Sequence, residues 1–402
     1  MTAPATFSWR NIALAAYGPT ALASIGYGAV TPLVALSAID RGATPGTAAL
    51  VTGLLGIGQL LADLPAGWVA ERLGEKWSII VACLIDVAML SSVSFTHSLL
   101  HLAIATFVTG ITGAVFGLAR QTYLTVAVPL QYRARALSSL GGVFRIGGLV
   151  GPLIGAAVVA TFGLPKAYLF AAAMSLLAAI VTLTLPDLST EAHGGNVPQS
   201  AGMFTVLRDS LGILLTQGVG ALVIMLTRSA RQAIIPLWCE AHGLSAAGTS
   251  LVYSISMAFD VALFFFGGSL MDRFGRVWVA APAMIVMGVG LALLPLTHHV
   301  GTIIAVACLL GLGNGISSGV VMTLGSDASP IVGRTKFLAG WRLLSDTGNA
   351  FGPLAIAAVA TVSTLGAASV VLGALAWGGA AWLLRWIPRG VESRQLTPET
   401  TH

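Results

Sequence analysis

Long apolar stretches separated by short polar breaks run through most of this sequence of 402 residues. A helix that crosses the hydrocarbon of a bilayer needs about 20 mostly apolar residues, because that layer is about 30 Å thick and a helix rises about 1.5 Å per residue. Twelve stretches meet this requirement: 11–38, 46–70, 77–96, 101–127, 137–162, 165–186, 210–236, 247–271, 278–297, 301–326, 337–362 and 365–387. The sequence therefore predicts twelve transmembrane helices.

The composition excludes the other broad classes of protein. Hydrophobic residues make up 56% of the chain and charged residues only 9%, whereas about a quarter of a soluble globular chain is charged. The apolar runs are too long and too uniform for the alternating strands of a membrane β-barrel. The three cysteines lie far apart in apolar stretches, so neither a disulfide framework nor a metal site is expected. The predicted fold class is an all-α membrane protein.

The basic residues indicate how the chain is oriented in the membrane. An even number of crossings places both termini on one side, and Lys and Arg gather on the cytoplasmic side. The predicted breaks on the terminal side carry Arg10, Arg72, Lys76, Arg133, Arg135, Arg208, Arg273, Arg276, Arg334, Lys336, Arg385, Arg389 and Arg394, and the opposite side carries only Arg41 and Lys166. We expect both termini to be cytoplasmic in a multi-pass protein of the cytoplasmic (inner) membrane. The net charge of +5 thus follows topology, and no nucleic-acid partner is expected.

The start of the chain allows a second interpretation. Arg10, the apolar run after it and Ala21-Leu22-Ala23 resemble a signal peptide with its cleavage site. The apolar run continues to Ile39, which is longer than such a segment. The first transmembrane helix is the interpretation that we favour.

The two halves of the sequence repeat each other. Identical residues recur 201 positions apart: Gly67/Gly268, Arg72/Arg273, Gly74/Gly275, Trp77/Trp278, Gly110/Gly311, Pro129/Pro330, Arg133/Arg334, Gly147/Gly348, Gly151/Gly352, Pro152/Pro353 and Leu153/Leu354. Near the first helix the spacing is 204, which matches residues 29–33 to residues 233–237. We predict two parallel six-helix bundles, residues 1–186 and 207–387, with a linker at 187–206 and a tail at 388–402. Parallel repeats of this kind are a transporter architecture, with the substrate site at the bundle interface near the bilayer midplane.

A loop motif occurs once in each half, after the second and the eighth predicted helices. Each copy has a glycine at a helix end, an acid–base pair and a second glycine where the chain turns sharply. The residues are Gly67, Glu71, Arg72 and Gly74 in the first copy, and Gly268, Asp272, Arg273, Gly275 and Arg276 in the second. The motif resembles the G-x-L-x-D-R-x-G-R-K signature of the major facilitator superfamily, although Glu71 and Glu75 depart from it.

That resemblance implies a fold and a role for the two loops. In this family the loop acid docks near the cytoplasmic end of helix 11 and holds the outward-open state. Carried over, Glu71 would lie beside Arg334 and Lys336, and Asp272 would lie beside Arg133 and Arg135. Ordinary charge anchoring at the membrane surface is the alternative interpretation of the loop charges.

The fifth predicted helix carries a second motif, with a partial copy in helix 11. Its residues are Gly147, Gly151, Pro152 and Gly155, and the copy consists of Gly348, Gly352 and Pro353. The pattern resembles the G-x-x-x-G-P-x-x-G-G motif of drug/proton antiporters, although generic membrane packing would also use small residues at this spacing. Many of these antiporters have an acidic residue in the first helix, whereas residues 11–39 contain no charged residue. Thr106 stands where these antiporters usually have an arginine. Proton coupling is therefore not implied by the resemblance alone.

Charged residues inside predicted spans are expensive, at about 2.5 kcal/mol or more each, so they are candidates for function. Asp260 in helix 8 and Arg145 in helix 5 have similar depths, and the resemblance places these helices face to face. We therefore predict that the two residues pair across the bundles. Arg342 and Asp346 in helix 11 are four residues apart and could pair locally, while Asp86 stands in helix 3 with either a structural or a proton-handling role.

Two interpretations of the Arg145–Asp260 pair stay open. Protonation of the carboxylate would remove the attraction, so the pair could couple proton movement to rocking of the bundles. It could equally be a permanent structural link. Asp260→Asn is predicted to abolish transport driven by a pH gradient while leaving folding intact.

Two further groups of polar residues lie on helices that the resemblance places around the cavity. Each group has two members three residues apart and therefore on one helical face. They are Arg120, Gln121 and Tyr123 in helix 4, and Arg228, Arg231 and Gln232 in helix 7. Unpaired guanidinium groups would favour anionic substrates, but each arginine could instead pair with a carboxylate such as Glu240 or Asp346.

These observations lead to one expected function with two alternatives. We expect a secondary transporter that exports a small organic compound, drug or metabolite, in exchange for protons. An importer or uniporter of a small organic anion is the first alternative, and a non-transporting membrane sensor or scaffold is the second. No phosphate-binding loop or nucleophile constellation indicates an enzyme, so the proton gradient, rather than a cofactor or metal, is the expected energy source. The expected partners are the lipid bilayer, the substrate and protons, and the chain is expected to act as a monomer.

Overall fold

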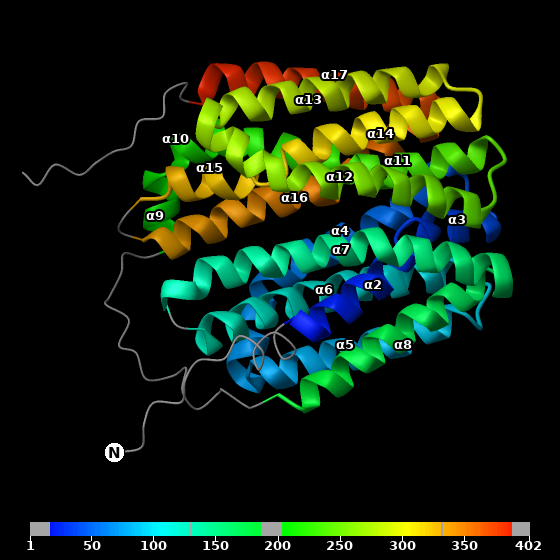
Figure 1. Ribbon diagram of the computed structural model, residues 1–402, viewed down its shortest axis with the longest axis horizontal. Coiled ribbons are helices and arrows are strands. Elements are labelled where there is room, and N and C mark those ends of the chain that lie inside the picture. The colour runs from blue at the N-terminus through cyan, green and yellow to red at the C-terminus, as the bar shows by residue number, and fades with distance from the viewer. Residues whose placement is uncertain (1–16, 129, 186–202, 331–332, 388–402) are drawn as a thin grey trace, which may run out of the picture.

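The computed structural model describes residues 17–128, 130–185, 203–330 and 333–387, and these residues form helices connected by short turns (Figure 1). The predicted tail and most of the predicted linker lie outside the described residues. The helices of the first half are α2 (Gly18–Val30), α3 (Leu33–Asp40), α4 (Pro45–Leu73), α5 (Glu75–Val93), α6 (Leu99–Ala127), α7 (Leu130–Phe162) and α8 (Leu164–Leu183).

The second half repeats this order of helices. It contains α9 (Met203–Asp209), α10 (Leu211–Ile213), the π-helical turn η2 (Leu214–Gly218), α11 (Val219–Ala241), α12 (Ala246–Phe274), α13 (Val277–Leu293), the 3₁₀ turn η3 (Leu294–Leu296), α14 (Val300–Ile316), α15 (Val320–Ala328), α16 (Arg334–Val362) and α17 (Leu365–Trp386). The bounds of α4 and α12 differ by the same 201 residues that relate the sequences of the two halves. The sequence repeat is therefore also a repeat of structure.

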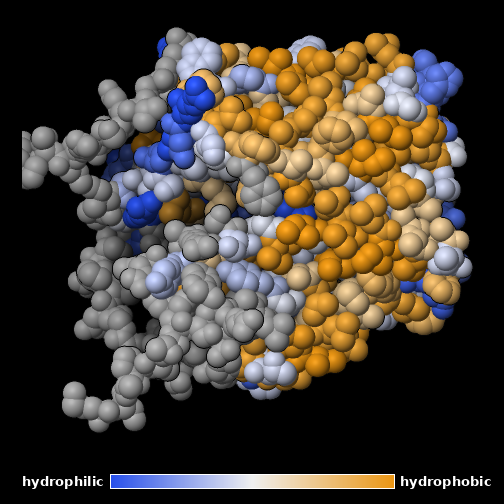
Figure 2. Space-filling model, in the orientation of Figure 1, coloured by the Kyte–Doolittle hydropathy of each residue, from blue (hydrophilic) through white to orange (hydrophobic). Residues whose placement is uncertain are grey.

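The apolar helices expose a broad apolar surface, as expected for a chain embedded in lipid (Figure 2). Within the described residues, eleven helical segments are long and apolar enough to cross a membrane. The remaining predicted span, the eleventh in sequence order, is helix α16; it has 29 residues, but polar residues such as Arg342 and Asp346 lower its mean hydropathy. It packs against α4 and α11, so part of its surface is covered by protein rather than lipid.

Three predicted spans are interrupted. The first contains α2 and α3, separated at Thr31 and Pro32 because proline lacks the N–H that a continuous helix needs. The seventh contains the short helix α10 and the π-helical turn η2 before α11, and the tenth divides into α14 and α15. Glycines with positive φ turn the chain in the two loop motifs, at Gly74 (φ 76°) and Gly275 (φ 90°), as the sequence predicts.

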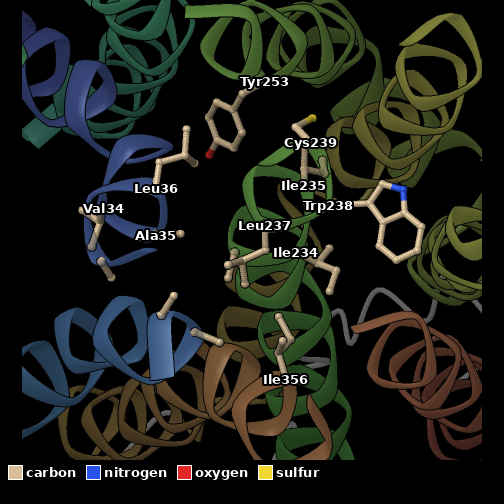
Figure 3. Packing of buried hydrophobic residues seen from close by; sticks show 14 of the residues in the cluster. Val34, Ala35, Leu36, Ile234, Ile235, Leu237, Trp238, Cys239, Tyr253 and Ile356 are labelled. Carbon is tan, nitrogen blue, oxygen red and sulfur yellow. The ribbon is translucent and has the colours of Figure 1, made fainter. Parts of the chain in front are cut away.

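The two ends of the molecule pack differently. We call the end at which α8 and α17 finish the terminal side, and the end with the turns at Gly42 and Gly243 the distal side. On the distal side, a single apolar cluster joins both halves, and Ala35 and Leu36 of α3 lie near Leu237 of α11 (Figure 3). On the terminal side, separate clusters belong to the second half and to the first half.

A cavity of about 780 Å³ lies between the halves on the terminal side, and Asp63, Gln121, Leu207, Leu338 and Arg342 are part of its lining. Its lining comes from α4 and α6 of the first half and from α9 and α16 of the second. The halves are therefore in contact through apolar side chains on the distal side and separated by open space on the terminal side.

Candidate functional site

The centre of the candidate site is the carboxylate of Asp260 on α12, which is 1% exposed. Nη1 of Arg145, on α7 of the other half, lies 2.9 Å from Oδ1 of Asp260. The structure thus brings together the two residues that the sequence indicated as partners across the bundles. The ring of Phe264 lies 4.4 Å from the guanidinium carbon of Arg145, a cation–π contact that also holds this side chain in place.

The second half supplies two more donors to the same carboxylate. Nη2 of Arg231 on α11 lies 3.2 Å from Oδ2 of Asp260, and Nδ2 of Asn314 on α14 donates to the same oxygen. Arg231 is itself 1% exposed, and its Nη1 donates to Oγ of Ser256 at 2.9 Å. A buried charge persists in a protein when it is paired and hydrogen-bonded, and Asp260 meets both conditions.

Positive charge exceeds negative charge in this cluster. Arg228, one helical turn from Arg231, interacts electrostatically with Arg145, Arg231 and Asp260. Arg228 Nη1 has a weak contact with the sulfur of Met225 at 3.8 Å, but Arg228 forms no ion pair among the described residues. Two guanidinium groups therefore contact one carboxylate at the bundle interface, and a third lies nearby without an ion pair among the described residues, so this cluster carries more positive than negative charge.

A second polar contact between the halves lies where α4 meets α16. Nη2 of Arg342 lies 3.5 Å from Oδ1 of Asp63, and its Nε lies 3.3 Å from Oδ2 of Asp346. Gln59 accepts a hydrogen bond from Asn349 at 3.3 Å. Arg342 thus forms both the local pair with Asp346 that its spacing indicates and a contact with the opposite half. Here two carboxylates meet one guanidinium, the reverse of the balance around Asp260.

A cavity of about 240 Å³ lies inside the first half. Asp86 of α5 and Arg120 of α6 both line it, and Oγ1 of Thr112 donates to Oδ1 of Asp86 at 2.5 Å. Arg120 lies over the ring of Phe116 at 5.6 Å. Neither Asp86 nor Arg120 has an ion-pair partner within the described part of the chain.

The remaining predicted cavity residues do not gather in one place. Gln121 is exposed to the terminal cavity, and Tyr123 is buried at 4% exposure. Gln232 lines a small pocket of about 50 Å³ between the halves, together with Tyr27 and Asn349. Five of the six candidates on α6 and α11 are therefore divided among the Asp260 cluster, the cavity of the first half and the space between the halves, and the sixth, Tyr123, is buried.

Comparison with known families decides the class of protein. The model of the Major Facilitator Superfamily matches residues 19–217 and again residues 217–401, one match in each structural half. This chain belongs to the Major Facilitator Superfamily. It is a multi-pass membrane transporter protein of a non-enzymatic family.

Curated relatives match only part of the chain. The multidrug resistance protein MdtG of Klebsiella pneumoniae (strain 342) is 29% identical over 187 residues, which is 45% of this chain and 45% of the relative. MdtG of Enterobacter lignolyticus (strain SCF1) is 26% identical over 176 residues, or 43% of this chain and 42% of the relative. The matched region thus spans less than half the length of these relatives.

Solved structures of the superfamily share the fold over almost the whole chain. The nucleoside transporter NupG superposes with a TM-score of 0.74 at 16% identity, covering 94% of this chain and 100% of NupG. The D-xylose–proton symporter gives a TM-score of 0.72 at 17% identity, covering 94% and 98%. At such identities the similarity concerns the fold alone.

The two superfamily loop motifs occupy the turns between α4 and α5 and between α12 and α13. Glu71 is exposed and forms no ion pair with Arg334 in the described part of the chain; Arg334 donates to Oγ of Ser326 at 2.7 Å.

The second copy makes its contacts within its own half. Arg276 lies 3.8 Å from Asp272 and 2.9 Å from Asp327. The predicted neighbours of Asp272, Arg133 and Arg135, have side chains outside the described part of the structure. The docking roles assigned to Glu71 and Asp272 thus stay predictions.

The antiporter-like motif residues face neighbouring helices of the same half. A side chain at Gly151 would collide with the backbone of Ile25 on α2, and a Cβ at Gly155 would lie 2.8 Å from the carbonyl oxygen of Ala29. In the second half, a side chain at Gly348 would collide with the backbone of Leu222 on α11. The motif lets α7 pack closely on α2 and α16 on α11, which is the packing role that the sequence left open.

Sequence reasoning missed two members of these contacts. Asn314 donates to Asp260, yet it stands in a glycine-rich apolar helix. The corresponding residue in the first half is Gly113, so the change from glycine to a polar residue could have indicated Asn314. Asp63, which contacts Arg342, likewise replaces an apolar residue of the other half, Phe264. Positions where the two halves differ in polarity would have identified both.

Proposed function

We propose that this protein exports a small organic compound in exchange for protons, by alternating access of a cavity between its two halves. The observation that carries the proposal is the contact between Arg145 and Asp260 at 2.9 Å, which joins α7 of one half to α12 of the other. The partial similarity to multidrug resistance proteins named MdtG favours export of a drug or metabolite.

The contact suits proton coupling because it changes when the halves move. Rocking of one half against the other would separate Arg145 from Asp260, whereas Arg231 and Asn314 would stay with Asp260 because they belong to the same half. Protonation of the carboxylate removes its attraction to Arg145 and lowers the barrier to separation. One proton would thereby be exchanged for one substrate-loaded movement.

The proposed orientation follows from the distribution of basic residues. We assign the terminal side to the cytoplasm, so that the open cavity of about 780 Å³ takes up its substrate from the cytoplasm or the inner leaflet. The protein would act as a monomer in the cytoplasmic membrane, because each chain holds both halves of the interface.

The experiment begins with growth of deletion and overexpression strains against a panel of toxic compounds. A compound whose tolerance falls on deletion and rises on overexpression is then assayed in inside-out vesicles. Antiport predicts that the vesicles accumulate this compound when their lumen is acid, and that the accumulation stops when a protonophore removes the gradient. Accumulation that ignores the pH gradient would refute proton coupling.

Variants of Asp260 separate coupling from folding. Asp260→Asn is expected to lower gradient-driven accumulation at least tenfold while gradient-independent exchange of labelled compound continues, because the amide cannot carry a proton in exchange. Asp260→Glu should retain coupling. Asp209→Asn, an exposed acid on α9, is the matched control and should behave as the unmodified protein.

A second function is favoured by one observation, the excess of positive charge around Asp260. Three guanidinium groups at the bundle interface would also suit uptake of a small organic anion. In that case right-side-out vesicles accumulate the anion, and loss of Arg228 (Arg228→Gln) weakens uptake more than loss of Asp260 does. The opposite ranking, with Asp260 dominant, supports proton-coupled export.

A further inference from the structure

The cavity of about 240 Å³ in the first half has a filled counterpart in the second half. Its lining includes Tyr27, Gln59, Cys83, Asp86 and Gly113. The positions that correspond to these residues in the second half are occupied by Arg231, Asp260, Met284, Met287 and Asn314. Met284 and Met287 are completely buried, and Arg231 and Asp260 are 1% exposed each. The same architectural space is thus packed with side chains in one half and open in the other.

Asp86 and Arg120 line this cavity with opposite charges and form no ion pair with each other, whereas Arg342, which also lines it, already contacts Asp63 and Asp346. Asp86 receives a hydrogen bond from Thr112, and Arg120 has a buried Nε that lacks a hydrogen-bond partner. A charge inside a membrane protein is costly unless it is paired or serves a ligand. Their presence in one cavity therefore calls for a partner that carries both complementary charges.

The spacing of the two charges sets the size of that partner. Asp86 lies beside Thr112, and Arg120 follows eight residues later on α6, about 12 Å along the helix axis at about 1.5 Å per residue. The guanidinium of Arg120 leans back over Phe116, one turn earlier, as long side chains on helices do. The two charged groups are therefore separated along the cavity by at least one helical turn, about 5.4 Å.

The walls between the charges are partly aromatic. Phe116 and Phe144 line the cavity with Tyr27, and the rings of Tyr27 and Phe144 are 6.4 Å apart. Gln59 and Arg342 also line it, so the cavity reaches the interface between α4 and α16. Its volume lies below the range of about 300–1,000 Å³ that drug-sized ligands occupy, which suits a smaller molecule.

We propose that this cavity binds small zwitterions with an apolar body, the cationic group at Asp86 and the anionic group at Arg120. This inference rests on the proposed transport function, for which it names the substrate class. It assigns recognition to the first half and leaves the coupling contact to Asp260 in the second.

Three matched probes test the proposal on the purified full-length protein in nanodiscs. They are 4-(aminomethyl)benzoate, which carries an amine and a carboxylate at opposite ends of one ring, 4-methylbenzylamine, which carries only the amine, and 4-methylbenzoate, which carries only the carboxylate. Titration calorimetry is expected to show at least tenfold tighter binding of the zwitterion than of either singly charged probe, a difference of about 1.4 kcal/mol, because each singly charged probe lacks one charge-assisted contact.

Variants assign the two ends of the ligand. Asp86→Asn should weaken the zwitterion at least tenfold and leave 4-methylbenzoate unchanged. Arg120→Gln should weaken the zwitterion to a similar extent and leave 4-methylbenzylamine unchanged. Asp209→Asn and Arg208→Gln alter the same residue types at exposed positions on α9 and should change none of the three affinities. Melting temperatures of all variants establish that they are folded.

Several results would overturn the proposal. Equal affinity for the zwitterion and the amine would make the cavity a cation site, and equal affinity for the zwitterion and the carboxylate would make it an anion site. Zwitterion binding that survives both cavity variants would place the ligand elsewhere. Binding is measured without a pH gradient, so the two proposals can fail separately. Absence of zwitterion binding would refute this inference and leave proton-coupled export untouched. Zwitterion binding by a protein whose transport does not depend on pH would refute only the proton coupling.

Discussion

The interiors of the two halves are lined by corresponding positions, but one interior is filled by side chains and the other contains a cavity. In the second half, Asp260 and Arg231 form a buried ion pair beside Met284 and Met287. In the first half, the corresponding positions hold Gln59, Tyr27, Cys83 and Asp86, which line a cavity.

This difference teaches how one fold can divide two tasks between repeated units. The backbone of each half follows the same helix order, so each offers the same interior space. Large and oppositely charged side chains fill that space in one half, which rigidifies it and leaves Asp260 for the contact with Arg145. Smaller side chains in the other half leave space for a ligand. Three experiments can break or sharpen this contrast.

The largest difference is expected for removal of the two buried acids. Asp260→Ala leaves Arg145 and Arg231 without their shared carboxylate, and a buried charge that loses its partner costs about 3–5 kcal/mol. Asp86→Ala removes an acid with no ionic partner among the described residues, so the expected loss is one hydrogen bond, about 1 kcal/mol. Unfolding in mixed micelles titrated with SDS measures both free energies.

Equal losses in the two variants would mean that Asp86 is as tightly integrated in its half as Asp260. The assignment of a binding role to the first half would then lose its physical basis. Asp209→Asn serves again as the exposed control.

Changes in side-chain volume should also affect the two halves differently. Met287 is completely buried, and Met287→Ala should cost about 2–5 kcal/mol because it leaves a cavity. Cys83→Met introduces the residue found at the corresponding position 284 and should change the free energy of unfolding by less than about 1 kcal/mol, because the existing cavity accepts it. A large loss for Cys83→Met would indicate that the first half is as tightly packed as the second.

The smallest expected effect concerns access to the two interiors. Variants with a single cysteine, either Cys83 alone or Met284→Cys alone, are treated with methyl methanethiosulfonate. Cys83 lines the cavity, so it should react at least tenfold faster than the cysteine at position 284, which must await local opening of about 1.4 kcal/mol or more. Equal rates, measured by mass spectrometry of the intact protein, would contradict an accessible cavity in the first half.

Much of the fold follows from local features of the sequence. Apolar length predicts the spans, and a repeat of 201 residues predicts helices that correspond in bounds, as α4 and α12 do. Interruptions within a span are harder to predict from the sequence. Pro32 interrupts the first span, whereas Pro236, at the corresponding position, lies inside the continuous helix α11. The same residue type gives two outcomes, because the neighbouring helices decide whether the freed carbonyl groups are accommodated.

The charged residues of the candidate site could be predicted from the sequence, whereas the neutral hydrogen-bonding residues that complete it could not. Asp260 and Arg145 stand out as ions within apolar spans at matching depth. Asn314 and Ser256 do not, since a single amide or hydroxyl in such a span is unremarkable until the rotation of each helix about its axis is known. The space beside Asp86 was equally invisible, because a void depends on every side chain around it.

The sequence by itself determined the apolar helices, the duplication and the few ionic residues that lie within those helices, since these depend on hydropathy and spacing along one chain. Only the tertiary structure decided which donors share Asp260, that Arg342 reaches Asp63 as well as Asp346, and that one half is filled where the other is hollow. These outcomes depend on how helices distant in sequence rotate and pack against one another, and no single stretch of residues encodes them.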